Sequence, residues 1–566
     1  MLRATYAKDT HRIAPRVHAS ETGGPRPSQQ DRGRRWAVRA TALAMILAPP
    51  LGWNAADAQT SRSVEIALPG SKQQRLSVGE LRDGIEALAG QGLASDRCGL
   101  DPVRGTLVVD LENDVQRKAL QASGFEVVRE FDAAPLHSRR TQAPYFAPDE
   151  IQAQLQQIHA AHPSITRLFV AGTTFEGRAI HAIEISDQPG VVEDEPSLLF
   201  NGQHHPREVA TSHVALDVAE RLTGDYGVDP TVTSWVTDFK TVVVPMVNPD
   251  GTQHVFDFNA LWRKNRQSYA GGCLGVDLNR NYPYRWGPAG CGFLASCPSS
   301  TYAGPSAGSE LETQAMIALA EAWDFTLAVS YHAFGRFIDY PYACSTGASG
   351  ELVPEHAVVD EVMNGMADAI DAVDAVPRYS VYSPASAGPV SGDDTSWYYA
   401  HRGTYAMIVE VGTSFEPAFS QVPGIVARNR GGWQYLYQRL AQARIDVHVT
   451  DATSGDPLLA DVSLTEIDYD SGELPRSTSL PFGRWTYLVP AGGSYTLNAS
   501  APGYQSAQTN VSVGNAPSAV NLALLPSAAL PALPPGALPG LVLALALGAR
   551  ALLQLRGRRV TIAARR

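Results

Sequence analysis

The architecture of this chain is indicated most clearly by the stretch Leu198-Leu-Phe-Asn-Gly-Gln-His-His-Pro-Arg-Glu208. Its first three residues form a short apolar run, which predicts a buried strand, and His205 and Glu208 follow just after it. A second apolar run, Phe325 to Ser330, ends just before His332. Open α/β sheets carry ligand-binding groups at strand ends, and two histidines with one carboxylate are typical ligands of a catalytic zinc ion. The pattern therefore predicts a zinc site at one edge of a sheet.

Further motifs follow the first one in a fixed order. They are Asn248-Pro-Asp-Gly251, Leu261-Trp-Arg-Lys-Asn-Arg266, Gly275-Val-Asp-Leu-Asn-Arg-Asn281, Tyr302-Ala-Gly with Ser309-Glu-Leu-Glu312, and Ile408-Val-Glu-Val411. In this order and spacing the motifs resemble the zinc carboxypeptidase family, which includes the pancreatic carboxypeptidases A and B. The resemblance covers roughly residues 142–440.

The resemblance implies a role for each residue of the catalytic machinery. His205, Glu208 and His332 would hold one zinc ion per chain. Glu410 would be the general base that takes a proton from zinc-activated water and delivers it to the leaving amine. Arg263 would stabilise the negative charge that develops on the carbonyl oxygen.

The resemblance also implies which residues bind substrate. Asn279 and Arg280 would grip the C-terminal carboxylate, because a planar guanidinium suits a bidentate carboxylate contact. Arg207 would support that pocket, and Asp277 would orient the first zinc-binding histidine. His204 is interpreted as a bystander beside His205.

Three positions depart from the family pattern. The tyrosine that caps the bound carboxylate should fall near Gly388, which has no side chain, so Tyr382 or another loop residue would have to replace it. Ser396 stands where an aspartate usually precedes Trp397. Thr395 occupies the floor of the specificity pocket.

Two carboxylates lie beside that pocket floor and leave the specificity open. Asp393 and Asp394 directly precede Thr395. A carboxylate inside the pocket would attract a C-terminal Lys or Arg residue. Alternatively, both aspartates face solvent and Thr395 lines a small neutral pocket.

The cysteines favour an oxidising compartment. The family resemblance implies a disulfide between Cys273 and Cys297. Cys291 and Cys344 could form a second bond, and Cys98 is left over.

Length and charge fit an exported protein of several parts. The 566 residues suggest about three or four domains. The formal net charge of -12 argues against nucleic acid as a partner. Residues 1–58 resemble a targeting segment, because the apolar run Ala40 to Leu51 follows a basic stretch and precedes a small-x-small cleavage site at Ala56-Asp-Ala58.

Residues 59–141 predict a small α/β unit. Thr106 to Leu111 and Phe125 to Glu130 are expected to be strands, with a helix from Glu112 to Ala122 between them. The unit resembles the prodomain of the family, which would shield the active site until it is cleaved near Arg139-Arg140. A folded spacer is the alternative.

Residues 142–440 predict the catalytic domain, an α/β fold with a mixed central sheet covered by helices. Helices are expected after Pro148, from Val209 to Leu222, and from Leu311 to Trp323. Residues 441–525 alternate short strands with turn residues, which is typical of a small all-β sandwich, and resemble the transthyretin-like domain of the regulatory carboxypeptidases.

Residues 526–566 form a third kind of segment. A proline-rich linker precedes an apolar run from Ala537 to Leu555, interrupted once by Arg550, and a basic end. The arrangement resembles a bacterial membrane-sorting tail, which would retain the enzyme at the outer side of a membrane.

The predicted function is an exported zinc metallocarboxypeptidase, acting as a monomer on peptides or proteins with a free C-terminus. A murein or γ-glutamyl peptide endopeptidase of the same fold would not need the Asn279–Arg280 clamp. An aspartoacylase-like deacylase should lack Asn248-Pro-Asp-Gly251, and a non-enzymatic binding protein should have lost a ligand or Glu410.

Overall fold

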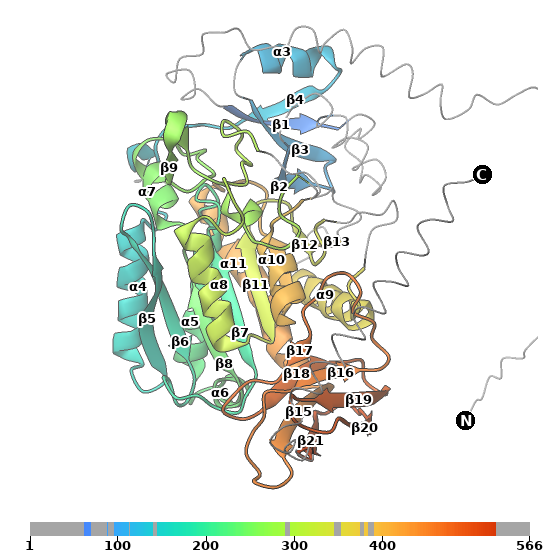
Figure 1. The fold of residues 1–566 in the computed structure, drawn as a ribbon. Coiled ribbons are helices and arrows are strands. Elements are labelled where there is room, and N and C mark those ends of the chain that lie inside the picture. The colour runs from blue at the N-terminus through green and yellow to red at the C-terminus, as the bar shows by residue number, and fades with distance from the viewer. Residues whose placement is uncertain are drawn as a thin grey trace, which may run out of the picture.

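The computed structural model describes residues 62–68, 88, 95–111, 114–139, 144–288, 295–344, 352–373, 379–382 and 390–527 (Figure 1). The predicted targeting segment, the apolar run of the C-terminal tail, Gly388 and Cys291 lie outside the described residues, as does the side chain of Cys98.

An eight-stranded mixed sheet forms the centre of the molecule. Its order is β13-β12-β14-β11-β7-β8-β6-β5. The strands are β5 (Thr166–Thr173), β6 (Ala179–Ile185), β7 (Ser197–Gly202), β8 (Lys240–Val244), β11 (Leu327–His332), β12 (Phe337–Asp339), β13 (Ser380–Tyr382) and β14 (Tyr405–Glu410). The central strands β14, β11, β7 and β8 are parallel, whereas β6 and β5 on one side, and β12 against β14 on the other, pair antiparallel.

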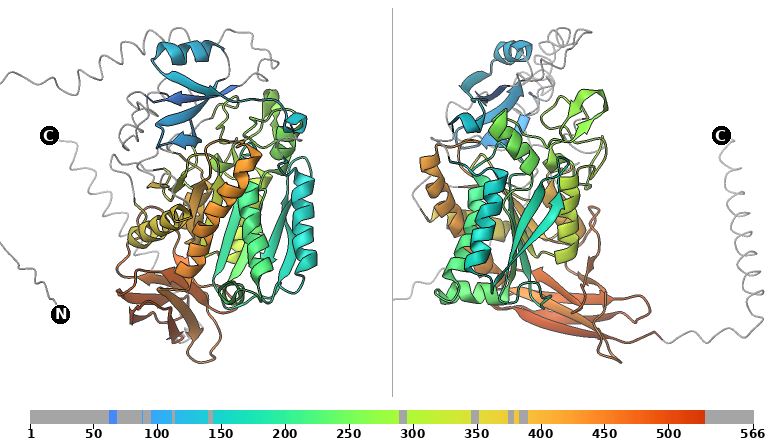
Figure 2. Two further views of the ribbon diagram at one scale, coloured as in Figure 1. Left: turned by 180° about the vertical axis from the view of Figure 1, so that it is seen from behind. Right: turned by 90° about the vertical axis from the view of Figure 1, so that its left-hand side faces the viewer.

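Helices cover both faces of this sheet. They are α4 (Pro148–Ala161), α5 (Thr211–Asp225), α6 (Pro230–Asp238), α7 (Pro249–Asp257), α8 (Leu311–Trp323), α9 (His356–Asp371), α10 (Asp394–Trp397) and α11 (Val422–Leu440). The side view in Figure 2 shows α4 and α8 on opposite faces. The predicted mixed sheet covered by helices is therefore confirmed, and α4 and α8 begin where the sequence placed them.

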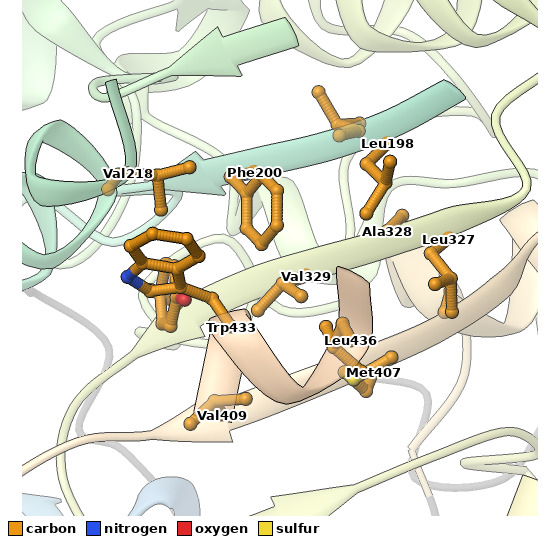
Figure 3. Close-up of a cluster of buried hydrophobic side chains, with 14 of the residues drawn as sticks. Leu198, Phe200, Val218, Leu327, Ala328, Val329, Met407, Val409, Trp433 and Leu436 are labelled. Atoms are coloured by element: carbon orange, nitrogen blue, oxygen red, sulfur yellow. The ribbon is translucent and has the colours of Figure 1, made fainter. Parts of the chain in front are cut away.

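Part of the main core lies between the parallel strands and α11. Figure 3 shows Trp433 and Leu436 of α11 packed over Phe200 and Val329, side chains of the buried strands β7 and β11. The indole Nε1 of Trp433 donates to Asp217 Oδ2 at 3.2 Å, so the buried ring has a polar partner. Strands buried on both faces need continuous apolar sequences, which explains why Leu198-Leu-Phe200 was recognisable as a strand.

The N-terminal unit is an antiparallel sheet with one helix. Its strands are β1 (Arg62–Ala67), β2 (Ser95–Asp101), β3 (Thr106–Leu111) and β4 (Glu126–Glu130), in the order β2-β3-β1-β4, and α3 (Asp114–Ala122) links β3 to β4. Figure 1 shows this unit at one end of the central sheet, opposite the C-terminal strands. Its core is continuous with Phe337 and Tyr382 of the central sheet, which means that the two units share buried apolar surface.

Two small sheets follow the last helix. The orders are β18-β15-β21 and β17-β16-β19-β20. The strands are β15 (Arg444–Asp451), β16 (Asp461–Leu464), β17 (Arg476–Ser477), β18 (Arg484–Leu488), β19 (Ser494–Ser500), β20 (Ala507–Ser512) and β21 (Ser518–Leu524). Both sheets contribute to one apolar cluster, which is the arrangement expected of a sandwich.

The two sheets are attached near the amino ends of the central strands. The backbone N–H of Leu488 donates to the Tyr405 hydroxyl at 3.1 Å, and Arg439 donates to the carbonyl of Val489 at 2.8 Å. Among the helices that the structure describes, none combines the length and the apolar character needed to cross a bilayer.

Candidate metal centre

The carboxyl ends of three neighbouring parallel strands meet at one point. His205 and Glu208 lie on the turn after β7, His332 is the last residue of β11, and Glu410 is the last residue of β14. Because β11 pairs with both β7 and β14, these side chains are brought to the same edge of the sheet. The candidate residues thus lie at strand ends, where open α/β sheets carry ligand-binding groups.

Three buried side chains converge there with the donor set of a zinc ion. His205 Nδ1 lies 2.7 Å from Glu208 Oε1 and 3.0 Å from His332 Nδ1, and His332 Nδ1 lies 3.1 Å from Glu208 Oε2. One ligand atom of each residue lies within 4.8 Å of the other two. An imidazole nitrogen without a proton accepts hydrogen bonds but donates none, and the same holds for a carboxylate. Two such nitrogens and a carboxylate therefore cannot hydrogen-bond to one another, whereas a cation between the three groups would satisfy them all. The residues present therefore fit zinc.

Asp277 holds the first of these histidines from behind. His205 Nε2 lies 3.1 Å from Asp277 Oδ1, and the other carboxylate oxygen accepts from Arg263 Nε at 2.9 Å. Burial by itself would raise the pKa of Asp277, but Arg263 and Arg280 outweigh it and hold the pKa well below the usual range. Asp277 is therefore an anion, which fixes the His205 ring with Nδ1 directed at the metal position.

The charge of Glu208 depends on the two histidines beside it. Burial by itself would raise the pKa of Glu208, but His205 and His332 outweigh it and lower the pKa below its usual range. Arg263 Nη1 lies 3.9 Å from Glu208 Oε1, so a guanidinium is held beside the ligands.

Glu410 is buried next to His332. The two residues are register partners, and the backbone N–H of Val411 donates to the carbonyl of His332 at 2.7 Å. The carbonyl of Glu410 accepts from the backbone N–H of Arg336 at 2.8 Å. These two backbone hydrogen bonds fix the main chain at the end of β14, where Glu410 lies.

The residues expected to bind the substrate carboxylate lie around this centre, with internal contacts of their own. The Asn279 amide nitrogen lies 3.4 Å from His332 Nε2, and its oxygen accepts from the backbone N–H of Asp394 at 2.8 Å. Arg280 Nη1 donates to the carbonyl of Asn279 at 2.6 Å. The Arg207 guanidinium lies over the Phe415 ring, 4.1 Å from its centroid.

The pocket-floor segment is a short helix with its own cap. Asp393 is the N-cap of α10, and its Oδ2 accepts from the backbone N–H of Ser396 at 2.8 Å and from the Thr395 hydroxyl at 2.9 Å. Asp393, Asp394 and Thr395 are all buried, so the sequence-based alternative in which both aspartates face solvent is wrong. The cap explains the burial of Asp393, because it supplies this carboxylate with hydrogen bonds in place of water.

The Tyr382 side chain packs against the N-terminal unit in this structure. Its ring lies 5.5 Å from the Phe337 ring and belongs to the core shared with the N-terminal unit. A capping role for Tyr382 would require it to leave this cluster.

Two residues without a predicted role at the metal centre lie beside His332. His204 and Asp394 are both fully buried, and their nearest polar atoms, His204 Nε2 and Asp394 Oδ2, are 3.7 Å apart. Burial, followed by the nearby His332 and His205, holds the pKa of His204 well below its usual range, and burial raises the pKa of Asp394 to about 7. The only sequence signal for His204 was its position next to His205. The sequence carried no signal for the orientation of Asp394.

The N-terminal unit lies directly over the centre. Asp110 of β3 contacts Arg207 Nη1 at 3.1 Å, and Asp101 of β2 contacts Arg336 Nη2 at 3.1 Å. The backbone N–H of Gly99 donates to the carbonyl of Phe334 at 2.8 Å. A side chain at Gly335 would come within 2.4 Å of the Leu100 carbonyl, which shows how closely β2 is pressed onto the loop after His332.

One disulfide closes the loop near the centre. Cys273 and Cys297 are bonded, with their Cα atoms 5.6 Å apart, as the family resemblance implied. Cys344 is also disulfide-bonded, while Cys291, its expected partner, lies outside the described residues.

Comparison with known proteins gives a consistent result. Residues 151–429 match the zinc carboxypeptidase family. Carboxypeptidase D of Mus musculus is 27% identical over 382 residues, covering 64% of this chain and 26% of the relative. Zinc carboxypeptidase A 1 of Anopheles gambiae is 30% identical over 290 residues, covering 48% of this chain and 62% of the relative. The chain thus spans about a quarter of the carboxypeptidase D sequences that it matches.

A solved structure shares the fold. Carboxypeptidase A from Helicoverpa armigera superposes with a TM-score of 0.55 at 21% identity, over 68% of this chain and 98% of that one. At this identity the likeness concerns the fold alone.

Proposed function

Because residues 151–429 belong to the zinc carboxypeptidase family, we propose that this protein is an exported zinc-dependent metallocarboxypeptidase that removes C-terminal residues from peptides or proteins. The observation that carries the proposal is the convergence of His205, Glu208 and His332 with Glu410 at the ends of three adjacent strands. The position of Glu410 at the end of β14, next to the strand that ends in His332, supports its proposed role as general base.

His205, Glu208 and His332 would hold the zinc ion. When bound, zinc supplies Lewis-acid chemistry, polarising a carbonyl oxygen and lowering the pKa of water. The protein fixes the ligand geometry in advance, since Asp277 orients His205 and the strand register orients His332.

Glu410 and Arg263 would perform the remaining chemistry. The Glu410 carboxylate takes the proton of the attacking water and passes it to the leaving amine, which departs neutral. The Arg263 guanidinium, held by Asp277, donates hydrogen bonds to the carbonyl oxygen as negative charge develops there.

Arg280, Asn279 and Arg207 would bind the substrate carboxylate. Arg280 is buried beside Asp277, so a carboxylate reaching it would be bound in a partly dry environment where charge-assisted hydrogen bonds are strong. Thr395 and Asp393 would border the side-chain pocket, with Asp393 held by the helix cap.

The N-terminal unit would act as a prodomain that covers the site. The pairs Asp110–Arg207 and Asp101–Arg336 place its carboxylates on arginines next to the metal centre, and the zinc ligands have no exposed surface. Removal of the unit at or near Arg139-Arg140 would expose them.

Export and attachment are proposed from the two ends of the chain. Residues 1–58 would direct secretion, and residues 526–566 would sort the protein to a membrane. The two C-terminal sheets would form a transthyretin-like domain that supports the enzyme.

The direct test measures hydrolysis of a peptide library by the purified protein, before and after limited proteolysis of the N-terminal unit. We expect loss of single C-terminal residues, complete inhibition by a chelator, and recovery on addition of zinc. Cleavage within peptides, or hydrolysis that the chelator does not affect, would refute the proposal.

A further inference from the structure

A loop of the C-terminal sheets reaches the catalytic domain. It connects β16 to β17, and we call it the 465–475 loop after its residues. The Ser471 carbonyl in this loop accepts from the Tyr284 hydroxyl at 2.8 Å and from Arg285 Nη2 at 3.0 Å. Arg285 has a φ of 50°, a left-handed conformation that a residue other than glycine keeps only where its surroundings fix it. The contact with Ser471 is part of what fixes the backbone there.

The same loop makes a second contact, to Tyr342. The Glu473 carboxylate accepts from the Tyr342 hydroxyl, and its Oε2 accepts from the backbone N–H of Ser471 at 2.8 Å. Burial, followed by the nearby Tyr284 and by the hydrogen bond to Glu473, raises the pKa of Tyr342, so the hydroxyl keeps its proton and acts as the donor. The Tyr284 and Tyr342 rings lie against each other, with centroids 5.2 Å apart and planes at 30°. The loop thus holds two stacked rings by their hydroxyl groups.

The segment that carries Tyr284 also carries Arg280, the residue proposed to bind the substrate carboxylate. Between them, the backbone N–H of Tyr282 donates to the carbonyl of Gly392 at 2.9 Å. Gly392 directly precedes Asp393, the N-cap of the pocket-floor helix α10. A displacement of Tyr284 would therefore disturb both the proposed carboxylate clamp and the start of the pocket floor.

The segment that carries Tyr342 contacts the same helix. The backbone N–H of the next residue, Ala343, donates to Ser396 Oγ in α10 at 3.0 Å, and the Ala343 carbonyl accepts from the backbone N–H of Val390 at 2.8 Å. These two hydrogen bonds hold the segment against the helix that carries Thr395, the proposed floor of the side-chain pocket.

The end of the loop is attached to the residues that directly follow α10. The backbone N–H of Leu474 donates to the carbonyl of Ala400 at 2.8 Å, and Arg476 Nη1 donates to the carbonyl of Tyr399 at 2.9 Å. Arg476 is buried, and its Nη2 lies 3.5 Å from Oε2 of the buried Glu355. Separating a buried ion pair leaves its charges without compensation, so this end of the loop is firmly held.

We propose that the 465–475 loop is a positioning element for the side-chain pocket of the substrate site. Through Ser471 and Glu473 it holds the two tyrosine-bearing segments in place against α10. The C-terminal sheets thereby influence which C-terminal residue is removed, although no residue of the loop needs to touch the substrate. The inference rests on the proposed function and assigns these sheets a part in its substrate preference.

Peptides of one sequence that differ only in the C-terminal residue test this inference in the full chain. We would compare kcat/KM for a peptide ending in Gly, which has no side chain to place in the pocket, with peptides ending in Phe, Leu, Lys and Arg. The ratio of the preferred residue to Gly does not depend on the fraction of active enzyme. In Glu473→Ala we expect this ratio to fall by about 10-fold, because a displaced pocket wall weakens the binding of the side chain and of no other part of the substrate.

Three further variants identify the contact that is responsible. Tyr342→Phe removes only the hydroxyl group and should lower the ratio to a similar extent, and combining it with Glu473→Ala should cost little more, because both changes remove the same hydrogen bond. Glu473→Gln keeps an acceptor oxygen and should restore most of the preference. Glu466→Ala is the matched control, because Glu466 lies in the same loop but accepts from the backbone N–H of Thr496 within the C-terminal sheets, and the ratio should not change.

Hydrogen exchange of the full chain, followed by mass spectrometry, gives a readout that does not depend on activity. We expect the amides of Tyr282 and Ala343, which are bonded to the pocket-floor region, to exchange faster in Glu473→Ala and Tyr342→Phe but not in Glu466→Ala. An unchanged ratio, an equal loss of kcat/KM for every peptide including the one ending in Gly, or unchanged exchange would overturn the inference and leave the proposed function intact. A wild type that hydrolyses none of the peptides would overturn the proposed function, and the exchange rates would still decide whether the loop holds the two segments.

Discussion

His332 and Glu410 are register partners at the carboxyl ends of the adjacent parallel strands β11 and β14. A ladder hydrogen bond from the backbone N–H of Val411 to the carbonyl of His332 fixes this relationship at 2.7 Å. A proposed metal ligand and a proposed general base are therefore separated by one strand spacing, about 5 Å. Neither can move along its strand without breaking the sheet, so the relative position of the two groups is set by the backbone.

We predict that His205→Ala abolishes zinc binding. The wild type should contain about one zinc ion per chain, and the variant should contain little, because a buried ligand is lost and the remaining Glu208 and His332 cannot complete the site. Metal analysis of purified protein checks this. His448→Ala is the control, since His448 pairs with Asp194 far from the centre and should retain zinc. Full zinc content in His205→Ala would show that the ion binds elsewhere.

Glu410→Gln should keep zinc and lose most turnover. The amide is nearly the same shape as the carboxylate but cannot accept the proton of water. The loss of a general base costs about 10²- to 10⁴-fold in kcat. Steady-state kinetics and metal analysis on the same sample test the prediction. A variant with near-normal kcat would rule out Glu410 as the base.

Arg280→Ala should raise KM for peptides that end in a free carboxylate. Loss of a charge-assisted contact of about 1.5–3 kcal/mol corresponds to roughly 10- to 100-fold. The wild type should cut the same peptides poorly when their C-terminus is amidated, and Arg280→Ala should discriminate less between the two. Equal cleavage of free and amidated peptides by the wild type would favour an endopeptidase.

Asp110→Asn should loosen the N-terminal unit and raise the activity of the uncleaved chain. Burial would raise the pKa of Asp110, but Arg207 and the hydroxyls of Ser300 and Ser63 outweigh burial and lower it, so the carboxylate is charged and paired at neutral pH. The amide would lose that pairing with Arg207. Asp114→Asn is the control, because Asp114 is largely exposed and should change nothing. If the uncleaved Asp110→Asn chain were no more active than the wild type, the contact would not restrict access.

The stability of the protein should fall between pH 6.5 and pH 4, in part because of His213. Burial lowers the pKa of His213 from 6.5 to about 4, and its ring stacks on Phe146 with centroids 4.4 Å apart. The unfolded chain binds a proton at higher pH than the folded chain does. The contribution of neutral His213 to the stability of the folded protein is therefore fully present above pH 6.5 and is lost as the pH falls through about 4.

The variant His213→Phe should flatten this part of the pH dependence. Denaturant unfolding at several pH values measures it, with an expected change in slope equivalent to about 1–3 kcal/mol across the window. An unchanged slope would assign the acid sensitivity to other groups.

Much of the fold was readable from local sequence. The helix Leu311–Trp323 and the strand Thr106–Leu111 have the predicted bounds, because the pattern of apolar residues is a local signal. The convergence of His205, Glu208 and His332 was also readable, since each residue follows an apolar run and such runs become strands of one sheet. The disulfide Cys273–Cys297 followed from the family resemblance.

The tertiary structure decided what those residues touch. The sequence could not show that Asp110 and Asp101 lie on Arg207 and Arg336, because these pairs join segments that are far apart along the chain. The sequence indicated Asp394 only as a carboxylate beside the pocket floor, whereas the structure buries it beside His204 and His332. Local conformation is determined by neighbours along the chain. Contacts between distant segments depend on how whole elements pack, and no periodicity in the sequence records that packing.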